Sequence, residues 1–209
     1  MKIIHIDATA NTEITLPKEA LEKLPEDLGI LTTIQHLKKL DSVKKQLPNA
    51  KVLGQVLGCD VSKAEGTSSF LYIGSGRFHP IEIKRQTKKE VFVYNPFTKE
   101  LNTITDEEIQ VLEKKQYAAY ANFLNARTIG ILVSTKPGQK ELQKARELKA
   151  RLDKTCYIFL GDMITPSEAE NFPFIDCFVN TACPRIRDDK FPRPIIDIRD
   201  LQRIDSSLS

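Results

Sequence analysis

The chain has 209 residues, of which 41% are hydrophobic and 28% charged, and its formal net charge is +3. This composition is ordinary for a globular protein with a buried core, and the length allows one large domain or two small ones. The positive charge is spread along the chain without a basic stripe, which argues against direct nucleic-acid binding.

The chain contains no apolar run long enough to span a membrane. The N-terminal segment MKIIHI reaches Asp7 too early to form the apolar core of a signal peptide. We therefore expect a cytoplasmic protein without a membrane partner. In that compartment the four cysteines are expected to serve as thiols, metal ligands or catalytic groups rather than as disulfides.

Strands and helical segments alternate through the first half of the chain. A helix is expected at 34–47, where apolar residues recur on one face. Alternation of this kind is typical of βαβ crossovers and a parallel sheet. The expected strands are 2–6, 28–33, 52–57, 69–73 and 91–95.

The second half repeats this pattern after a long helix. The capping box of Thr105 and Glu108 predicts the start of that helix, which runs to about Asn125. A strand is expected at 129–133 and a helix at 137–153, with Pro137 near its first turn. The segments 155–162 and 177–183 then repeat 51–60 and 70–76 of the first half. We predict an α/β fold of two related domains, 1–122 and 123–209, each a small parallel sheet flanked by helices. Their junction is expected in the long helix or near 122–127.

Two cysteines, Cys59 and Cys183, each follow an apolar strand. When the two halves are aligned, Cys59 lies opposite Asp162 and Cys183 opposite Gly76, so the cysteines occupy strand ends of neighbouring order. Ligands of open parallel sheets bind at the carboxyl ends of strands, where a thiolate can hold a metal, a cluster or a substrate. The absence of any CxxC pair argues against a self-contained zinc site. The other cysteines, 156 and 177, alternate with large apolar residues and are expected in the core.

Two polar loops also follow strands. GSGRFHP (74–80) supplies Gly74, Gly76, Arg77 and His79, and suits either a carboxylate or phosphate site or a tight strand-to-helix connection with a solvated arginine. A nucleophilic cysteine with His79 as its base is conceivable, but nothing in the sequence fixes such a pair in space. In STKPGQ (134–139), Lys136 and Gln139 are available to a ligand, although capping of the next helix by Ser134 or Thr135 is the better interpretation of that segment alone.

The remaining histidines have weaker contexts than His79. His5 is expected in a strand and His36 at the start of a helix, and both are expected to be structural or solvent-facing.

Four segments in series resemble the signature segments of archaeal diphthamide synthase, a member of the diphthamide synthesis subunit family. The resemblance covers almost the whole chain, and the order, spacing and flanking strands agree. The segments are GQVLGCD (54–60), YIGSGRFHP (72–80), GILVSTKPGQ (130–139) and FVNTACPRI (178–186).

The resemblance implies a radical enzyme that uses S-adenosylmethionine. Family members have three related α/β domains, each giving one cysteine to a 4Fe-4S cluster, and transfer a 3-amino-3-carboxypropyl group to a histidine of elongation factor two. Cys59 and Cys183 match the cluster ligands of the second and third domains. The resemblance also implies a cofactor-binding role for a set of loop residues, namely Gly74, Gly76, Arg77, His79, Lys136, Gln139 and Arg185.

The sequence departs from the family pattern because it begins at the first strand of the second domain. The resemblance therefore implies that the family's first domain and its cysteine are not in this sequence, and two thiolates do not reproduce a three-cysteine site. We expect a homo- or hetero-oligomeric partner that completes the cluster and makes the chain active. The alternatives are a non-catalytic paralogue or accessory subunit that binds S-adenosylmethionine or a partner chain in the same cleft, and a metal-free two-domain hydrolase or binding protein.

Overall fold

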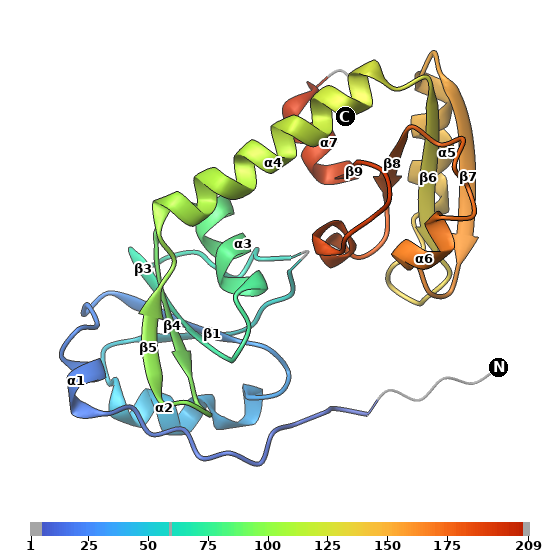
Figure 1. Cartoon of the computed structure of the whole chain (residues 1–209). Coiled ribbons are helices and arrows are strands. Elements are labelled where there is room, and N and C mark those ends of the chain that lie inside the picture. The colour runs from blue at the N-terminus through green and yellow to red at the C-terminus, as the bar shows by residue number, and fades with distance from the viewer. Residues whose placement is uncertain (1–5, 59, 207–209) are drawn as a thin grey trace. The chain divides into compact units, whose positions relative to one another are not determined.

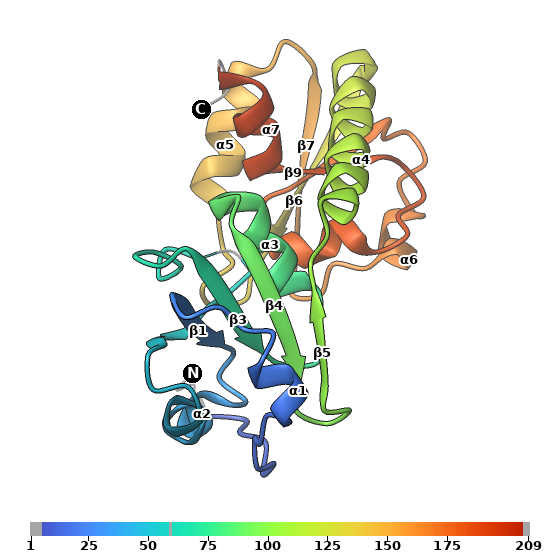
Figure 2. The same ribbon diagram turned by 90° about the vertical axis from the view of Figure 1, so that its left-hand side faces the viewer.

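The computed structural model describes residues 6–58 and 60–206 (Figures 1 and 2). The chain divides into two compact units, residues 1–109 and 110–209, and the division falls inside helix α4, Asp106–Asn125. The boundary expected from the sequence, at 122, lies in the same helix. No helix in the described ranges is both long enough and apolar enough to cross a membrane.

The first unit contains a five-stranded sheet in the order β2-β1-β3-β4-β5. Its first four strands run parallel, whereas β5 pairs antiparallel with β4 and closes one edge (Figure 2). The strands are β1 (Leu28–Thr32), β2 (Lys51–Gln55), β3 (Ser69–Ile73), β4 (Glu90–Asn95) and β5 (Glu100–Thr103). The helices of this unit are α1 (Lys18–Leu21), the 3₁₀ turn η1 (Leu37–Lys39), α2 (Leu40–Gln46) and α3 (Phe78–Thr87).

The central strands of this sheet are buried on both faces. Every residue of β1 and β3 is buried. Successive residues of a strand point to opposite faces, so Leu71 packs with α2 residues such as Val43, while Tyr72 packs with Ile83 of α3. A nearly continuous apolar strand is what a parallel sheet covered on both faces requires.

The second unit contains a four-stranded parallel sheet in the order β7-β6-β8-β9. This is the order of the first four strands of the first unit, so the internal repeat seen in the sequence is a repeat of topology. The strands are β6 (Thr128–Ser134), β7 (Thr155–Gly161), β8 (Cys177–Asn180) and β9 (Ile195–Asp197). The helical elements are α5 (Leu142–Arg151), α6 (Pro166–Ala169), the 3₁₀ helix η2 (Pro184–Asp188) and α7 (Ile198–Ile204).

The core of the second unit contains two of the cysteines. Cys156 and Cys177 pack with Leu148 of α5 and Leu201 of α7 on one face of the sheet. Burial raises the pKa of both thiols, that of Cys177 to about 12. The prediction that these two cysteines are structural is confirmed.

Three predicted elements differ from the structure. The strand expected at 2–6 lies outside the described residues except for Ile6, which is not in a strand. The helix expected at 34–47 begins three residues later, with a 3₁₀ turn at Leu37–Lys39. The helix expected at 137–153 begins only at Leu142, because Gly138 adopts a positive φ of 77° in a turn that precedes it.

His36 was expected to be either structural or solvent-facing. The structure shows that it is buried. Its side chain is fully inaccessible, and within the described residues neither ring nitrogen has a hydrogen-bond partner. Its ring lies 5.7 Å from that of Phe97, measured between centroids. Burial therefore lowers the pKa of His36 below its ordinary value of 6.5.

Acidification is expected to destabilise the protein through His36. As the pH falls below 6.5, the unfolded chain binds a proton that the folded chain resists, so the free energy of unfolding drops by up to about 1.4 kcal/mol per pH unit. His36→Leu should remove this contribution, since it replaces the two unsatisfied nitrogens by apolar atoms. Denaturant unfolding of both proteins between neutral pH and pH 5 measures the difference. Parallel pH profiles for the two proteins would contradict the assignment.

Candidate functional site

The cysteine at 183 lies at the carboxyl end of an interior strand. β8 lies between β6 and β9 and ends at Asn180, and Cys183 is the residue that precedes η2. Its side chain is partly exposed, in contrast to the two core cysteines. The structure thus places Cys183 where the sequence predicted, at the edge where parallel sheets bind ligands.

A buried asparagine holds the loop that carries Cys183. Asn180 is fully buried, and its amide nitrogen donates to the carbonyl oxygen of Cys183 at 2.9 Å and to Oδ2 of Asp197 at 3.0 Å. Its Oδ1 accepts from the backbone N–H of Ala182 at 3.1 Å. One side chain therefore fixes both the start and the end of the short turn between the strand and the cysteine.

The partner of Asn180 is itself held in place. Asp197 is 1% exposed and also accepts from the backbone N–H and Nε of Arg199, both at 3.0 Å. On the other side of the loop, Thr181 donates its hydroxyl to the carbonyl of Leu132 at 2.8 Å. The loop is thus tied to β6 and to β9, which restricts the positions open to the cysteine.

Asn180→Ala should loosen this loop. The change removes one donor from the Asp197 carboxylate and one from the Cys183 carbonyl, and it takes the side-chain acceptor from the N–H of Ala182, which costs about 1–3 kcal/mol of unfolding free energy. The reaction of Cys183 with an alkylating reagent, followed by mass spectrometry of its peptide, should become faster. The exposed Asn171→Ala is the matched control. Unchanged stability together with an unchanged alkylation rate would contradict the role given to Asn180.

The loop after β6 is a turn and not a helix start. Gln139 donates its backbone N–H to the carbonyl of Lys136 at 3.1 Å, and the Ser134 hydroxyl accepts the N–H of Lys136 at 3.1 Å. Helix α5 begins after Glu141 with no side-chain cap, so the prediction that Ser134 or Thr135 caps it is wrong. The side chain of Lys136 is exposed and that of Gln139 partly so, which leaves both accessible from solvent.

Basic side chains follow Cys183 in η2. Arg185 is exposed and lies two residues after the cysteine, so it adds a positive charge to the same loop. Arg187 instead points into the unit, where its Nη1 contacts the carboxylate of Asp200. Of these two arginines, Arg185 is the one accessible to an anionic ligand.

In the first unit, the two glycines of GSGRFHP, Gly74 and Gly76, differ in burial and in their contacts. Gly74 is buried and donates its N–H to the carbonyl of Tyr94 at 3.0 Å. A Cβ at Gly74 would lie 2.8 Å from the hydroxyl of Tyr72, so a side chain there would displace the buried tyrosine ring. Gly76 is exposed, and a Cβ there would meet nothing within 4 Å. Gly74 therefore serves the strand end, whereas Gly76 leaves its backbone open to solvent.

Arg77 is engaged by a carboxylate of its own unit. Its Nε donates to Oε1 of Glu108 at 2.8 Å, and its Nη2 donates to the carbonyl of Thr103 at 3.0 Å. Partial burial raises the pKa of Glu108, but hydrogen bonds from Arg77 and Thr105 outweigh this and hold it below its usual value. An anionic ligand at Arg77 would have to compete with Glu108, and this favours the structural interpretation of the arginine.

His79 stacks on a buried tyrosine. The rings of Tyr72 and His79 are 5.9 Å apart and nearly parallel, and the Tyr72 hydroxyl lies 3.4 Å from Nδ1 of His79. Burial raises the pKa of Tyr72 to about 12, against an opposing hydrogen bond from Thr33. The hydroxyl therefore keeps its proton at neutral pH, and it can donate to Nδ1 of His79 or accept from it, according to the tautomer of the ring.

The other predicted ligand, Cys59, lies outside the described residues, and so does His5. The residues on either side of Cys59 are described: the backbones of Leu57 and Asp60 exchange hydrogen bonds of 3.0 and 3.1 Å. A Cβ at Gly58 would lie 1.9 Å from the ring of Phe78, so this turn packs on the first residue of α3 through a glycine. Within the described ranges, no three His, Cys, Asp or Glu side chains are arranged to hold a metal ion.

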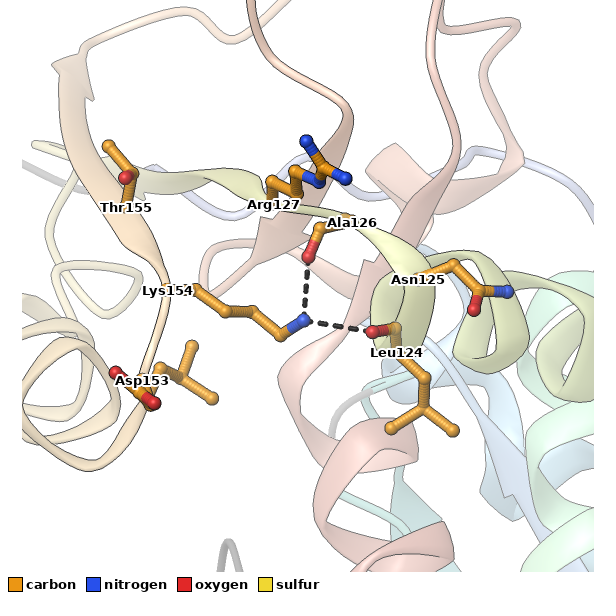
Figure 3. Close-up of a pocket in the computed structure, with 8 residues that line it drawn as sticks. Leu124, Asn125, Ala126, Arg127, Asp153, Lys154 and Thr155 are labelled. Atoms are coloured by element: carbon orange, nitrogen blue, oxygen red, sulfur yellow. Dashed lines mark hydrogen bonds between the residues drawn. The ribbon is translucent and has the colours of Figure 1, made fainter.

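A hollow of the second unit lies at the opposite ends of its strands from Cys183. It has a volume of about 620 Å³ and is lined by residues around the starts of β6 and β7 (Figure 3). Lys154 spans it, donating to the carbonyls of Leu124 at 2.9 Å and Ala126 at 2.6 Å (Figure 3). These carbonyls end α4, so the lysine caps that helix and offsets its dipole. This hollow is structural and is distinct from the carboxyl edge that carries Cys183.

Three residues of the site were missed in the sequence, namely Tyr72, Asn180 and Asp197. The available signal was the polar Asn180 at the end of the apolar run CFVN, because a buried amide must find partners. Tyr72 gave no comparable signal, since a tyrosine within a strand is ordinary.

Comparison with known proteins identifies the relatives of this chain. A family model described as "Putative diphthamide synthesis protein" matches residues 1–204. The 2-(3-amino-3-carboxypropyl)histidine synthase of Methanocaldococcus jannaschii is 34% identical over 164 residues, which cover 76% of this chain and 45% of that protein. The enzyme of the same name from Pyrococcus horikoshii is 31% identical, with 82% of this chain and 54% of that protein covered.

The solved structures agree with these sequence matches. The crystal structure of Dph2 from Pyrococcus horikoshii superimposes with a TM-score of 0.81 at 27% identity, and covers 94% of this chain and 63% of that one. The structure of Dph2 from the same organism with a 4Fe-4S cluster gives a TM-score of 0.77 at 28% identity, with 88% and 58% covered. The chain spans about half the length of the curated relatives it matches. From its sequence and its fold, the chain belongs to the diphthamide synthesis protein family.

Proposed function

We propose that this chain takes part in the transfer of the 3-amino-3-carboxypropyl group of S-adenosylmethionine to a histidine of elongation factor two. Membership of the family supports the class of reaction, since the curated relatives are named for it. The observation that carries the proposal is the presentation of Cys183 at a strand end, on a loop fixed by Asn180.

A 4Fe-4S cluster is the cofactor proposed, because a structural relative carries one. Cysteine thiolates hold such clusters. Among the described residues, Cys183 is the accessible thiol, while Cys156 and Cys177 are buried and their raised pKa values disfavour thiolates. The described residues alone therefore do not make a complete cluster site. Cys59 is proposed as a second ligand, and a third thiolate must come from polypeptide outside this sequence.

The exposed basic residues of the second unit have a proposed role in binding the substrate. Lys136 and Arg185 follow β6 and β8, two neighbouring strands, at their carboxyl ends. Both are exposed, so they can attract the α-carboxylate of S-adenosylmethionine. Radical cleavage of the carbon–sulfur bond of S-adenosylmethionine is the chemistry that a bound cluster would supply.

The test is the content of iron and acid-labile sulfide per chain after anaerobic reconstitution, with a low-temperature EPR spectrum of the reduced protein. A near-stoichiometric 4Fe-4S signal that changes on addition of S-adenosylmethionine would support the proposal. If the isolated chain binds no iron, the same measurement is repeated with a co-purified polypeptide that brings a further cysteine. Absence of a cluster in both cases would overturn the cluster-based role.

The second candidate is a non-catalytic paralogue or accessory subunit that binds S-adenosylmethionine or a partner chain. One observation favours it, the engagement of Arg77 by Glu108. Iron-free protein that still binds S-adenosylmethionine in calorimetry, or that binds a partner chain without assembling a cluster, would select this candidate.

A further inference from the structure

A buried tyrosine and a partly exposed histidine meet at the carboxyl end of strand β3. Tyr72 belongs to β3 and is 2% exposed, whereas His79 is the second residue of helix α3. Their rings are nearly parallel, and the Tyr72 hydroxyl lies 3.4 Å from Nδ1 of His79. A second ring, that of Phe78, contacts His79 edge-on with 5.4 Å between centroids. The imidazole is therefore confined by two aromatic neighbours, and one of them presents a hydroxyl to it.

The first glycine of GSGRFHP makes room for that hydroxyl. A Cβ at Gly74 would lie 2.8 Å from the Tyr72 oxygen and also 2.8 Å from a carbon of its ring. Gly74 is not among the glycines with a positive φ, so what the missing side chain provides is space and not backbone freedom. Its N–H donates to the carbonyl of Tyr94 at 3.0 Å, which ties its backbone to β4. A side chain at position 74 would therefore displace the tyrosine ring.

Thr33 and His79 are both hydrogen-bonding neighbours of the Tyr72 hydroxyl, which must find an acceptor for its proton because it is buried. Burial raises the pKa of Tyr72 to about 12, against an opposing hydrogen bond from Thr33. A bond that lowers the pKa of a phenol is donated to its oxygen, because it stabilises the anion. With Thr33 as that donor, the Tyr72 proton is left for Nδ1, which accepts when the imidazole proton is on Nε2.

We propose that Tyr72 is a positioning residue, which uses the space left by Gly74 to donate a hydrogen bond to Nδ1 of His79 and so keeps the imidazole proton on Nε2. A neutral imidazole donates through one nitrogen and accepts through the other, so this bond sets which nitrogen does which. The ring then offers a donor at Nε2. The ligand group that this donor suits is an oxygen or nitrogen acceptor of S-adenosylmethionine, an assignment that rests on the proposed function, whereas the positioning of the ring does not.

The first test reads the tautomer of His79 by NMR of protein labelled with ¹⁵N-histidine, at a pH where the ring is neutral. The chain has three histidines, and His79→Gln identifies the signals of this one. In the wild type Nδ1 should carry no proton and Nε2 should carry one. Tyr72→Phe should lower the ratio of the Nε2–H to the Nδ1–H form by about threefold or more, because one hydrogen bond to Nδ1 is lost.

Tyr94→Phe is the matched control for this change. Tyr94 lies in β4, the neighbouring strand, is 1% exposed, and donates its hydroxyl to the carbonyl of Thr15 at 2.6 Å. Its substitution also removes a buried hydroxyl from the same sheet, but the tautomer of His79 should stay that of the wild type. Gly74→Ala should act as Tyr72→Phe does, and Tyr72→Phe alone decides if the alanine variant does not fold. A wild-type proton on Nδ1, or the same shift in both phenylalanine variants, would overturn the proposal.

The second test measures the binding of S-adenosylmethionine by calorimetry. Tyr72→Phe should raise the dissociation constant by about threefold or more, whereas Tyr94→Phe should bind as the wild type does. A wild type that does not bind, or equal affinities of all three proteins, would overturn the role in ligand binding. The NMR test needs neither iron nor S-adenosylmethionine, so its outcome is separate from that of the proposed transfer reaction.

Discussion

Replacing Cys183 by alanine should abolish iron binding by the reconstituted protein, whereas Cys156→Ala should leave it intact. Cys183 is the accessible thiol of the described residues, on a loop held at the carboxyl end of β8. Cys156 is 7% exposed, and its side chain packs in the core of the second unit. Its loss should cost about 1 kcal/mol of unfolding free energy, as expected for a small cavity. Iron and sulfide per chain, together with denaturant unfolding, measure the two effects.

Two further variants make this series decisive. Cys59→Ala should reduce the iron content as strongly as Cys183→Ala, because both are proposed ligands of one cluster. Cys177→Ala serves as a second core control, since its thiol is fully buried with a pKa raised to about 12. The unfolding midpoint of Cys183→Ala should stay close to that of the wild type. Equal loss of iron from the core variants and from Cys183→Ala would contradict the assignment.

The architecture could be predicted because its main signals are local. The buried strands β1, β3 and β6 are near-continuous apolar runs, which parallel sheets with two covered faces require. The start of α4 was predicted from its capping box, and the structure confirms it: Thr105 and Glu108 exchange hydrogen bonds of 2.9 and 3.3 Å. Each of these signals lies within a few residues of the element it specifies.

The boundaries that failed depend on loop conformation. The expected helix at 137–153 assumed that Pro137 begins it, which is the usual position for a proline at a helix start. In the structure the chain turns at Gly138 and helix α5 starts at Leu142. Strand β5 was missed because its residues ELNT carry little apolar character, and it forms by pairing with β4 after a short turn.

The candidate site could be predicted in position but not in its contacts. The strand-end location of Cys183 follows from the strand that precedes it. The contacts that hold its loop do not follow from the local sequence, because Asn180 bonds to Asp197 on another strand. In the same way, Arg77 bonds to Glu108, more than thirty positions further along the chain. Partners so distant in sequence are chosen by the tertiary fold. The sequence therefore made Arg77 a candidate ligand-binding residue, whereas in the structure it contacts the carboxylate of Glu108 in the same unit.

The buried ion pair of Arg187 and Asp200 joins η2, the short helix that follows Cys183, to helix α7. Asp200 of α7 is 1% exposed, and its Oδ2 accepts from Nη1 of Arg187 in η2 and from Nε2 of Gln116 in α4 at 2.9 Å. The side chain of Arg187 is 9% exposed. The short helix that begins after Cys183 is thus joined to α7 and α4 of its own unit through one carboxylate.

Asp200→Ala should therefore be among the most destabilising substitutions of the second unit. It removes the buried carboxylate that contacts the Arg187 guanidinium, while Asp188, 3.9 Å from Nε, is exposed, and the loss costs about 3–5 kcal/mol of unfolding free energy. Denaturant unfolding measures the loss. The double variant Arg187→Met/Asp200→Leu, which removes both charges, should recover most of the stability, because apolar residues can replace a buried pair at little cost. The exposed Asp189→Ala is the control at the surface of the same loop.

The two variants also separate stability from the placement of the cysteine. If the ion pair only stabilises the unit, the double variant should recover both stability and the alkylation rate of Cys183. If the pair also holds η2 against α7, the double variant should recover stability while Cys183 still reacts faster than in the wild type. The second result is expected, because Arg187 reaches Asp200 from the helix that Cys183 begins, and an apolar pair lacks the directed hydrogen bonds that fix this helix. A loss below 1 kcal/mol in Asp200→Ala would show that the pair contributes little to either property.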